Sequence, residues 1–206
     1  MTELYIIGAG GHGAVVADIA LACGYTIVGF IDDNFCCQGT TVLYWSVLGG
    51  RGVIPAGSFV AIAIGNNAMR TRVFHELQHT GYQLPMLIHP SATVSSFAAI
   101  GPGTVVMPQV VVNARSRIGD GCILNTACSV DHDCSIGDFV HLAPGARLAG
   151  DISVGSGTLI GIGSCLHPGI TIGQEAVIGA GSVVLRDIAD RCTAYGNPAR
   201  VRLLGG

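Results

Sequence analysis

The chain has 206 residues; half of them are hydrophobic, 11% are charged, and the formal net charge is −3. This balance carries no basic excess, which argues against nucleic acid and anionic membrane surfaces as partners. The composition is typical of a body dense in buried strands, and Gly, Pro, Asn or Asp interrupts every apolar run before it could span a bilayer. The N-terminus lacks a basic region followed by a signal-type apolar stretch, so we expect a cytoplasmic protein.

The N-terminal part of the chain alternates short apolar strands with helices. Strands are predicted over residues 4–7, 26–31 and 59–64, and helices over residues 14–23 and from the end of the third strand to Gly81. Such alternation is typical of a small parallel sheet. We therefore expect residues 1–85 to form a small α/β Rossmann-like domain.

A glycine-rich loop, Gly8-Ala9-Gly10-Gly11-His12-Gly13, follows the first strand, and Asp32-Asp33 comes about 20 positions later, as in a dinucleotide fingerprint. Backbone N–H groups at a helix N-terminus bind any pyrophosphate, including that of a nucleotide sugar. A sheet of about four strands is half of a full dinucleotide fold and leaves no second half for a nicotinamide. Pyrophosphate binding is favoured; the alternative is that the glycines serve only a tight turn.

From residue 86 onward the chain repeats in hexads. Each sixth residue is Ile, Leu or Val at 17 positions: Ile88, Val94, Ile100, Val106, Val112, Ile118, Leu124, Val130, Ile136, Leu142, Leu148, Val154, Ile160, Leu166, Ile172, Ile178 and Val184. A short fixed period is typical of a solenoid, in which each unit buries its apolar side against its neighbours.

Glycines indicate how many hexads make one coil. Gly101, Gly119, Gly137, Gly155 and Gly173 each follow an aliphatic position and recur in every third hexad. Glycine tolerates positive φ and crowded corners, so one corner recurs once per three hexads. This predicts a triangular prism with three faces of short parallel strands, about 4.8 Å apart along the axis. The fourth residue after each aliphatic one is usually small or slender, and both positions are expected to point inward.

The eight cysteines could indicate a metal site or disulfides. Cys122, Cys128 and Cys134 occupy the small inward position of consecutive hexads, where cysteine behaves as a small hydrophobe. The chain has no CxxC pair, and the adjacent Cys36 and Cys37 suit neither a zinc knuckle nor an ordinary disulfide. We therefore expect reduced, structural thiols and no metal.

One histidine stands in an acidic setting. His132 lies between Asp131 and Asp133 in a region otherwise poor in charge. A carboxylate beside an imidazole fixes its tautomer and raises its basicity, which suits a general base. His141 follows half a coil later, so the two side chains could meet only if neighbouring prisms pack side by side. The alternative is a pair of ordinary surface histidines.

These features together resemble a known family. The hexads, Gly10-Gly11-His12-Gly13, Asp32-Asp33, Gly65-Asn66-Asn67, Asn125-Thr126, Asp131-His132-Asp133 and Gly196-Asn197-Pro198-Ala199 are similar to the hexapeptide-repeat acyltransferases of the PglD/NeuD type. The resemblance covers essentially the whole chain. It implies that residues 86–206 form a left-handed parallel β-helix with a C-terminal tail, and that the protein acetylates a nucleotide-linked amino sugar or sialic acid.

The resemblance also implies roles for individual residues. His132 matches the family's general base and Asp133 its acidic partner, which is Glu in the bacillosamine-pathway enzyme, so that Asp here shortens the reach. The positions matching acetyl-CoA contacts are His141, Gly150, Ile162 and Ala180. The positions matching nucleotide-sugar contacts are Gly10, Gly11, His12, Asp32, Asp33 and Gly65.

We therefore expect an acetyl-CoA-dependent N-acetyltransferase of a UDP-linked amino sugar, of the UDP-4-amino-4,6-dideoxy-sugar type, for surface glycan or glycoprotein biosynthesis. Acetyl-CoA is the cosubstrate. Three alternatives remain open: O-acetylation of sialic acid or a related sugar, a metal-dependent lyase of the γ-carbonic-anhydrase kind, and a non-catalytic nucleotide-sugar-binding scaffold. The lyase needs three clustered histidines, and the spacing of His132, His141 and His167 does not match the closely spaced pair expected there.

Outward apolar residues on the prism predict assembly. Val105, Val111, Ile123 and Leu159 would expose sizeable patches on a single prism, and such patches usually mark interfaces. Family members are homotrimers with active sites between subunits, so we expect three prisms around a threefold axis, each site taking His132 from one chain and His141 from the next.

Overall fold

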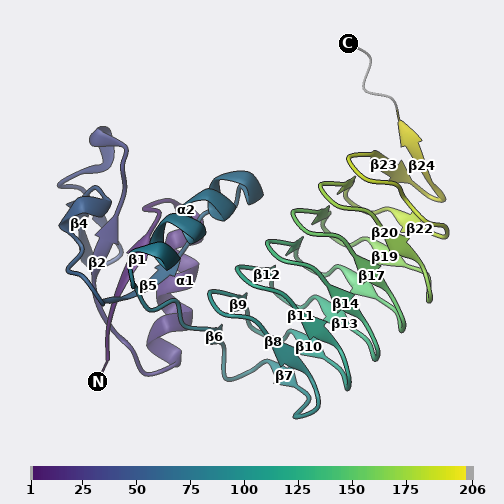
Figure 1. Ribbon diagram of the computed structural model, residues 1–206, viewed down its shortest axis with the longest axis horizontal. Helices are drawn as coiled ribbons and strands as arrows, with labels where there is room; N and C mark the ends of the chain where they lie inside the picture. Colours follow the sequence, from purple (N-terminus) through teal and green to yellow (C-terminus); the bar gives the residue numbers. More distant parts are fainter. Residues whose placement is uncertain (1, 203–206) are drawn as a thin grey trace.

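A computed structural model describes residues 2–202, which form an α/β unit followed by a triangular prism of stacked coils (Figure 1). The first unit contains a five-stranded sheet in the order β3-β4-β2-β1-β5, parallel throughout except for the β3–β4 hairpin. Its elements are β1 (Glu3–Ile7), α1 (Gly11–Ala22), β2 (Thr26–Ile31), η1 (Phe35–Cys37), β3 (Thr41–Val42), β4 (Trp45–Gly49), η2 (Arg51–Val53), β5 (Phe59–Ile62) and α2 (Asn67–His79).

Two details of this unit differ from the sequence prediction. Helix α1 begins at Gly11 and not at residue 14, with Gly10 as its N-cap, so His12 lies in the first helical turn and not in the loop. A Cβ on Gly13 would lie 2.1 Å from the carbonyl oxygen of Gly8, so only glycine lets the helix start this close to β1. The β3–β4 hairpin was not predicted, because its strands are short and polar residues interrupt them.

The prism consists of two-residue strands, one in each hexad. They are β6 (Leu87–Ile88), β7 (Thr93–Val94), β8 (Ala99–Ile100), β9 (Val105–Val106), β10 (Val111–Val112), β11 (Arg117–Ile118), β12 (Ile123–Leu124), β13 (Ser129–Val130), β14 (Ser135–Ile136), β15 (His141–Leu142), β16 (Arg147–Leu148), β17 (Ser153–Val154), β18 (Leu159–Ile160), β19 (Cys165–Leu166), β20 (Thr171–Ile172), β21 (Val177–Ile178) and β22 (Val183–Val184). A terminal hairpin, β23 (Thr193–Gly196) and β24 (Ala199–Arg202), extends one face.

Each strand from β6 to β19 pairs in parallel with the third strand after it, one coil further along, as Ile123 of β12 pairs with His141 of β15. The result is three faces, here named by their middle strands: the β12 face (β6, β9, β12, β15, β18, β21, β23, β24), the β13 face (β7, β10, β13, β16, β19, β22) and the β14 face (β8, β11, β14, β17, β20). This confirms the predicted left-handed parallel β-helix and its coil of three hexads.

The inward positions are also confirmed. The aliphatic hexad residues from Val106 to Val184 are buried, and so are the small residues four positions after them, including Cys122, Cys128 and Cys134. Buried hydroxyls bond to the backbone of the next coil, as Thr104 Oγ1 donates to the Gly119 carbonyl at 2.9 Å. The buried hydroxyls of the prism are therefore paired.

The corner glycines are required for close approach and not for positive φ. A Cβ on Gly101, Gly119, Gly137, Gly155 or Gly173 would lie 2.2 to 2.7 Å from an atom of the next coil, and none of the five has a positive φ. Positive φ occurs instead at every sixth residue from Gly103 to Gly181, non-glycine residues included. The coil thus places one left-handed residue in each of these turns.

The two units share a core. Buried residues of the sheet, of α1 and of the first coils form one continuous hydrophobic cluster, and α1 contacts β6. In consequence, Val105 and Ile123 are buried within a single chain, which corrects the expectation that they lie exposed; Val111 and Leu159 are half-buried. The α/β unit covers the first strands of the β12 face. No helix within residues 2–202 is long and apolar enough to cross a bilayer.

Gly119→Ala should destabilise the prism, because its Cβ would lie 2.3 Å from Asp138 Oδ1 and 2.7 Å from the backbone of the next coil. Such overpacking costs about 1–3 kcal/mol, measurable as a lower midpoint of thermal unfolding. Gly52→Ala is the control, since its Cβ would meet nothing within 4 Å. Equal midpoints for the two variants would contradict the crowding argument.

Candidate active site

His132 occupies the turn between β13 and β14, where its ring is paired with a carboxylate. Its Nδ1 lies 2.7 Å from Asp133 Oδ2. Because an ionised carboxylate only accepts hydrogen bonds, Nδ1 carries the proton and Nε2 is left as an acceptor. Asp133 has a left-handed backbone (φ 60°) that turns its short side chain back toward the ring. The shorter Asp side chain therefore still reaches the ring nitrogen.

Residues of the preceding and the following coil contact this turn. Arg115, one coil earlier, donates from Nε to Asp133 Oδ1 at 2.5 Å and from Nη2 to Oδ2 at 2.7 Å. These bonds, followed by the one to His132, hold the pKa of the Asp133 carboxyl well below its usual range. On the other side, a Cβ on Gly150 would lie 2.5 Å from Cε1 of His132, so the imidazole rests on the bare Cα of Gly150. Neither contact was apparent from the sequence.

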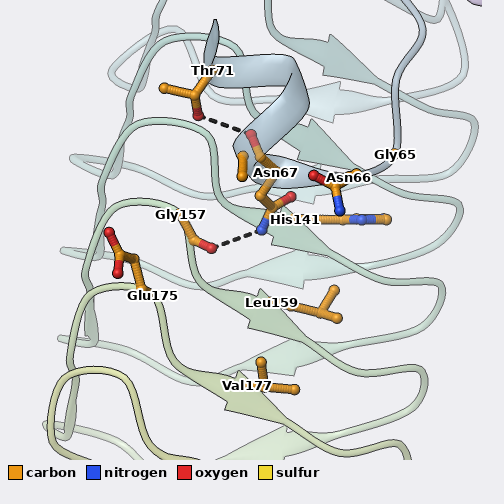
Figure 2. A pocket seen from close by; sticks show the side chains of 10 residues that line it. Gly65, Asn66, Asn67, Thr71, His141, Gly157, Leu159, Glu175 and Val177 are labelled. Carbon is orange, nitrogen blue, oxygen red and sulfur yellow. Dashed lines mark hydrogen bonds between the residues drawn. The ribbon is translucent and has the colours of Figure 1, made fainter.

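His141 lies elsewhere, on β15 in the β12 face, at the rim of a cavity of about 610 Å³ (Figure 2). Leu159 and Val177 continue the row below it, and the N-terminus of α2 covers the cavity. Gly65 lines this cavity too. Asn67 joins helix to prism, because its Nδ2 donates to the Gly157 carbonyl at 2.8 Å.

The tautomer of His141 follows from its neighbours. The Oδ1 of Asn125 accepts from the Thr126 N–H at 2.8 Å, which turns its Nδ2 toward His141 Nε2 at 3.2 Å. The amide nitrogen can only donate, so Nε2 accepts and the ring proton sits on Nδ1. His141 is thus a neutral imidazole with a fixed orientation.

A buried arginine that the sequence analysis missed connects the two units. Arg70 on α2 is 1% exposed, and among residues 2–202 its guanidinium donates to neutral oxygens alone. They are the carbonyls of Gly121, Ile64, Gly65 and Phe139 and the side-chain Oδ1 of Asn67. The signal was present, since Arg70 is one turn before Val73 and Phe74 on the apolar side of the predicted helix.

The charge of Arg70 acts on two histidines. Burial, together with Arg70, lowers the pKa of His12 to about 4, and the same two causes, with a smaller contribution from His12, lower that of His141 to about 4. His12 Nε2 is buried and has no hydrogen-bond partner among the described residues. The structure therefore brings His12 of the α/β unit close to His141 of the prism, a proximity that the sequence could not predict.

Asp32 and Asp33 line a second cavity, of about 300 Å³, at the C-terminal ends of β1 and β2. Asp32 Oδ2 accepts from the N–H of Ala9 in the glycine loop at 3.0 Å, and Asp33 bonds to Arg51. Gly10 and Gly11 have open space around their Cα atoms. The loop and the aspartates are thus adjacent, as a nucleotide site would require, whereas Gly65 belongs to the other cavity.

The remaining predicted residues lie on a different corner. Ile162 and Ala180 stack one coil apart in the turns that follow β18 and β21, and Ile162 is 59% exposed. Gly150 and His132 lie in turns that follow strands of the β13 face. Within one chain, then, the residues matched to acetyl-CoA contacts do not form a single cluster.

The eight cysteines are free, and burial raises the pKa of the Cys122 and Cys128 thiols to about 12. These two thiols are therefore poor nucleophiles at neutral pH. Across residues 2–202, His, Cys, Asp and Glu side chains form no group of three or more that could hold a metal ion.

Comparison with known proteins agrees with this architecture. The PglD N-terminal domain matches residues 3–77, and the bacterial transferase hexapeptide (six repeats) matches residues 151–186. The acetyltransferase domain of PglB from Neisseria gonorrhoeae is 43% identical, with a TM-score of 0.92 over 98% of this chain and all of that one. This chain belongs to the PglD-type hexapeptide-repeat acetyltransferases.

The names of two further relatives state a bound ligand or an activity. PerB from Caulobacter crescentus, solved with CoA and GDP-perosamine, is 39% identical, with a TM-score of 0.92 over 98% of each chain. The UDP-N-acetylbacillosamine N-acetyltransferase of Bacillus subtilis is 41% identical over 113 residues, 52% of this chain and 52% of that protein. The match thus spans about half the length of this curated relative.

The two buried histidines predict a pH dependence of stability. Because their native pKa values are about 4 and the ordinary pKa of histidine is 6.5, the unfolded chain binds protons in this window that the native chain does not. Stability should therefore be full above pH 6.5 and fall as the pH drops toward 4. In thermal unfolding across this window, a His12→Gln, His141→Gln double variant should show a shallower loss. An unchanged slope would contradict the assignment.

Proposed function

We propose that this protein transfers the acetyl group of acetyl-CoA to the amine of a nucleotide-linked amino sugar, with His132 as general base. The observation that carries the proposal is the His132–Asp133 pair, which leaves Nε2 free to accept a proton. The relatives solved with acetyl-CoA, and with CoA and GDP-perosamine, support it. Because the Caulobacter crescentus and Bacillus subtilis enzymes are both named N-acetyltransferases, N-acetylation is favoured over O-acetylation of a sialic acid.

The chemistry is a direct transfer. The sugar amine adds to the thioester carbonyl carbon, and Nε2 of His132 removes a proton from the attacking nitrogen. The carbon–sulfur bond then breaks, and the leaving CoA sulfur takes the proton back from His132. Asp133 stabilises the imidazolium that forms in between. The buried Cys122 and Cys128 thiols make a covalent acyl-enzyme on either residue unfavourable.

The α/β unit, residues 1–85, is proposed as the nucleotide-sugar domain, and residues 86–206 as the acetyl-transfer domain. The glycine loop (Gly10, Gly11, His12) and the cavity at Asp32 and Asp33 are the proposed nucleotide site. Relatives with UDP-linked and GDP-linked substrates in their names are both similar to this chain, so the UDP sugar expected from the sequence is a prediction. A cytoplasmic location stays a prediction as well.

The complete site is proposed to form between subunits of a homotrimer. His132 and the cavity beside His141 lie on different sides of one prism, so one chain cannot present both to the same acceptor. Closed threefold packing would set the His132 corner of one prism against the β12 face of the next. Gly65 and His141 would then contact the sugar and thioester beside His132 of the neighbour, and Gly150, Ile162 and Ala180 would line the CoA path.

His132→Ala should lower turnover by roughly 10²–10⁴-fold, the usual contribution of a general base. The assay follows CoA release from acetyl-CoA with UDP- and GDP-linked 4-amino-4,6-dideoxy sugars as acceptors. The control is His167→Ala, an exposed histidine that bonds only to the adjacent Pro168 carbonyl among described residues. Turnover of His132→Ala equal to that of the control would overturn the proposed role.

Subunit mixing tests the shared site. Chains carrying His132→Ala and chains carrying His141→Ala are combined under conditions that exchange subunits. If the two histidines act from different chains, some mixed interfaces hold both native residues, and activity should exceed that of either parent. Absence of recovery after verified exchange, or a monomer by light scattering at micromolar concentration, would refute the shared site.

A further inference from the structure

The coil before His132 carries two polar side chains directly above the catalytic turn. Asn113 Nδ2 donates to Asp131 Oδ1 at 2.8 Å, and the same oxygen accepts the backbone N–H of His132 at 2.8 Å. This chain of bonds fixes the backbone of the histidine. The pairing is possible because residues one coil apart occupy equivalent turn positions.

Arg115 makes the corresponding contact to the carboxylate that holds the ring. Both Arg115 and Asp133 are left-handed residues, with φ of 64° and 60°, so their side chains leave the corner in the same direction. The guanidinium takes both carboxylate oxygens, which fixes the plane of the carboxylate as well as its position. Oδ2 is shared between Arg115 Nη2 and His132 Nδ1.

Without Arg115, little would hold Asp133 in this rotamer. The side chains of Arg115, Asp133 and His132 are 69%, 35% and 56% exposed, so solvent competes for every oxygen. A single-point contact between Asp133 and His132 leaves the carboxylate free to rotate about its side-chain bonds. Exposed ion pairs contribute little to folding stability, so the effect of this pair should be on geometry and not on stability.

We propose that Arg115 is a positioning residue for acetyl transfer: its two-point contact holds Asp133 so that His132 keeps its proton on Nδ1 and presents Nε2 to the acceptor amine. The inference rests on the proposed role of His132 as base. Arg115 acts through Asp133, to which its guanidinium donates both hydrogen bonds. Gly150 completes the arrangement from the following coil by leaving space for the imidazole in this orientation.

A double-mutant cycle tests the proposal by activity. Arg115→Met should lower kcat about 10-fold, with KM for both substrates within about twofold of the native value. Asp133→Asn should lower kcat by a similar or larger factor, and the double variant should be no worse than Asp133→Asn alone, because both changes remove one function. Arg117→Met, an exposed arginine two positions away, is the matched control and should retain the native kcat.

Three results would overturn it: a native kcat for Arg115→Met, a rise in KM alone, or a double variant whose loss is the product of the two single losses. A fall in the thermal midpoint of Arg115→Met that accounts for the lost activity would indicate a merely structural role. Should that variant fold poorly, Arg115→Lys keeps the charge without the fork, and we expect a kcat between those of Arg115→Met and the native protein. A native kcat in Arg115→Lys would show that the two-point contact is not needed.

A second readout does not depend on activity. In the native protein, ¹⁵N shifts of the neutral His132 ring should report one tautomer with the proton on Nδ1, whereas Arg115→Met should show a mixture. If the tautomer changes in this way but His132→Ala keeps its turnover, the proposed base is wrong while the role of Arg115 in positioning stands. If His132→Ala is inactive and the tautomer of Arg115→Met is native, only the role of Arg115 fails.

Discussion

The in-register stacking of three-hexad coils is the constraint on which the prism depends. Two-residue strands are too short to be stable singly, and each becomes so only by hydrogen bonding to the strand one coil before and one coil after. Because the register never shifts between Ile88 and Val184, equivalent turn residues of successive coils stack on one another along the prism axis. The same register explains the crowded glycine corners, the left-handed residue in each turn and the ladders of polar side chains.

The turn that carries His132, the proposed base, is a product of that stacking. Three successive coils meet at His132: the coil before supplies Arg115 and Asn113, its own coil supplies Asp133, and the coil after supplies the bare Cα of Gly150. A solenoid can assemble such a site from single residues because its neighbours are spaced by one strand separation. The same geometry separates His132 from His141 by half a coil, which is the physical reason why we propose a site formed between chains.

The junction between the α/β unit and the prism depends on a buried charge and not on repeated stacking. Arg70 brings a full charge into a buried position where it bonds only to neutral oxygens. Burial, together with the charge of Arg70, keeps His12 and His141 unprotonated near neutral pH, and the Asn125 amide fixes the tautomer of His141. The cavity beside His141 is therefore bordered by a neutral imidazole with a fixed orientation.

The sequence by itself determined the features that repeat or that lie close together along the chain. The hexad period and the spacing of the corner glycines predicted the coil and its inward positions, and the adjacency of His132 and Asp133 indicated a paired base. Contacts between distant segments were decided only by the tertiary structure: the burial of Val105 and Ile123, the bonds of Arg70 to the prism, and the approach of His12 to His141. The hexad period could have predicted that Arg115 and Gly150 lie near His132, since each occupies a turn one coil away from it. Spacing alone does not say which of the stacked side chains form hydrogen bonds. Periodicity fixes which residues are stacked, whereas packing between the α/β unit and the prism depends on shapes and charges that no repeat encodes.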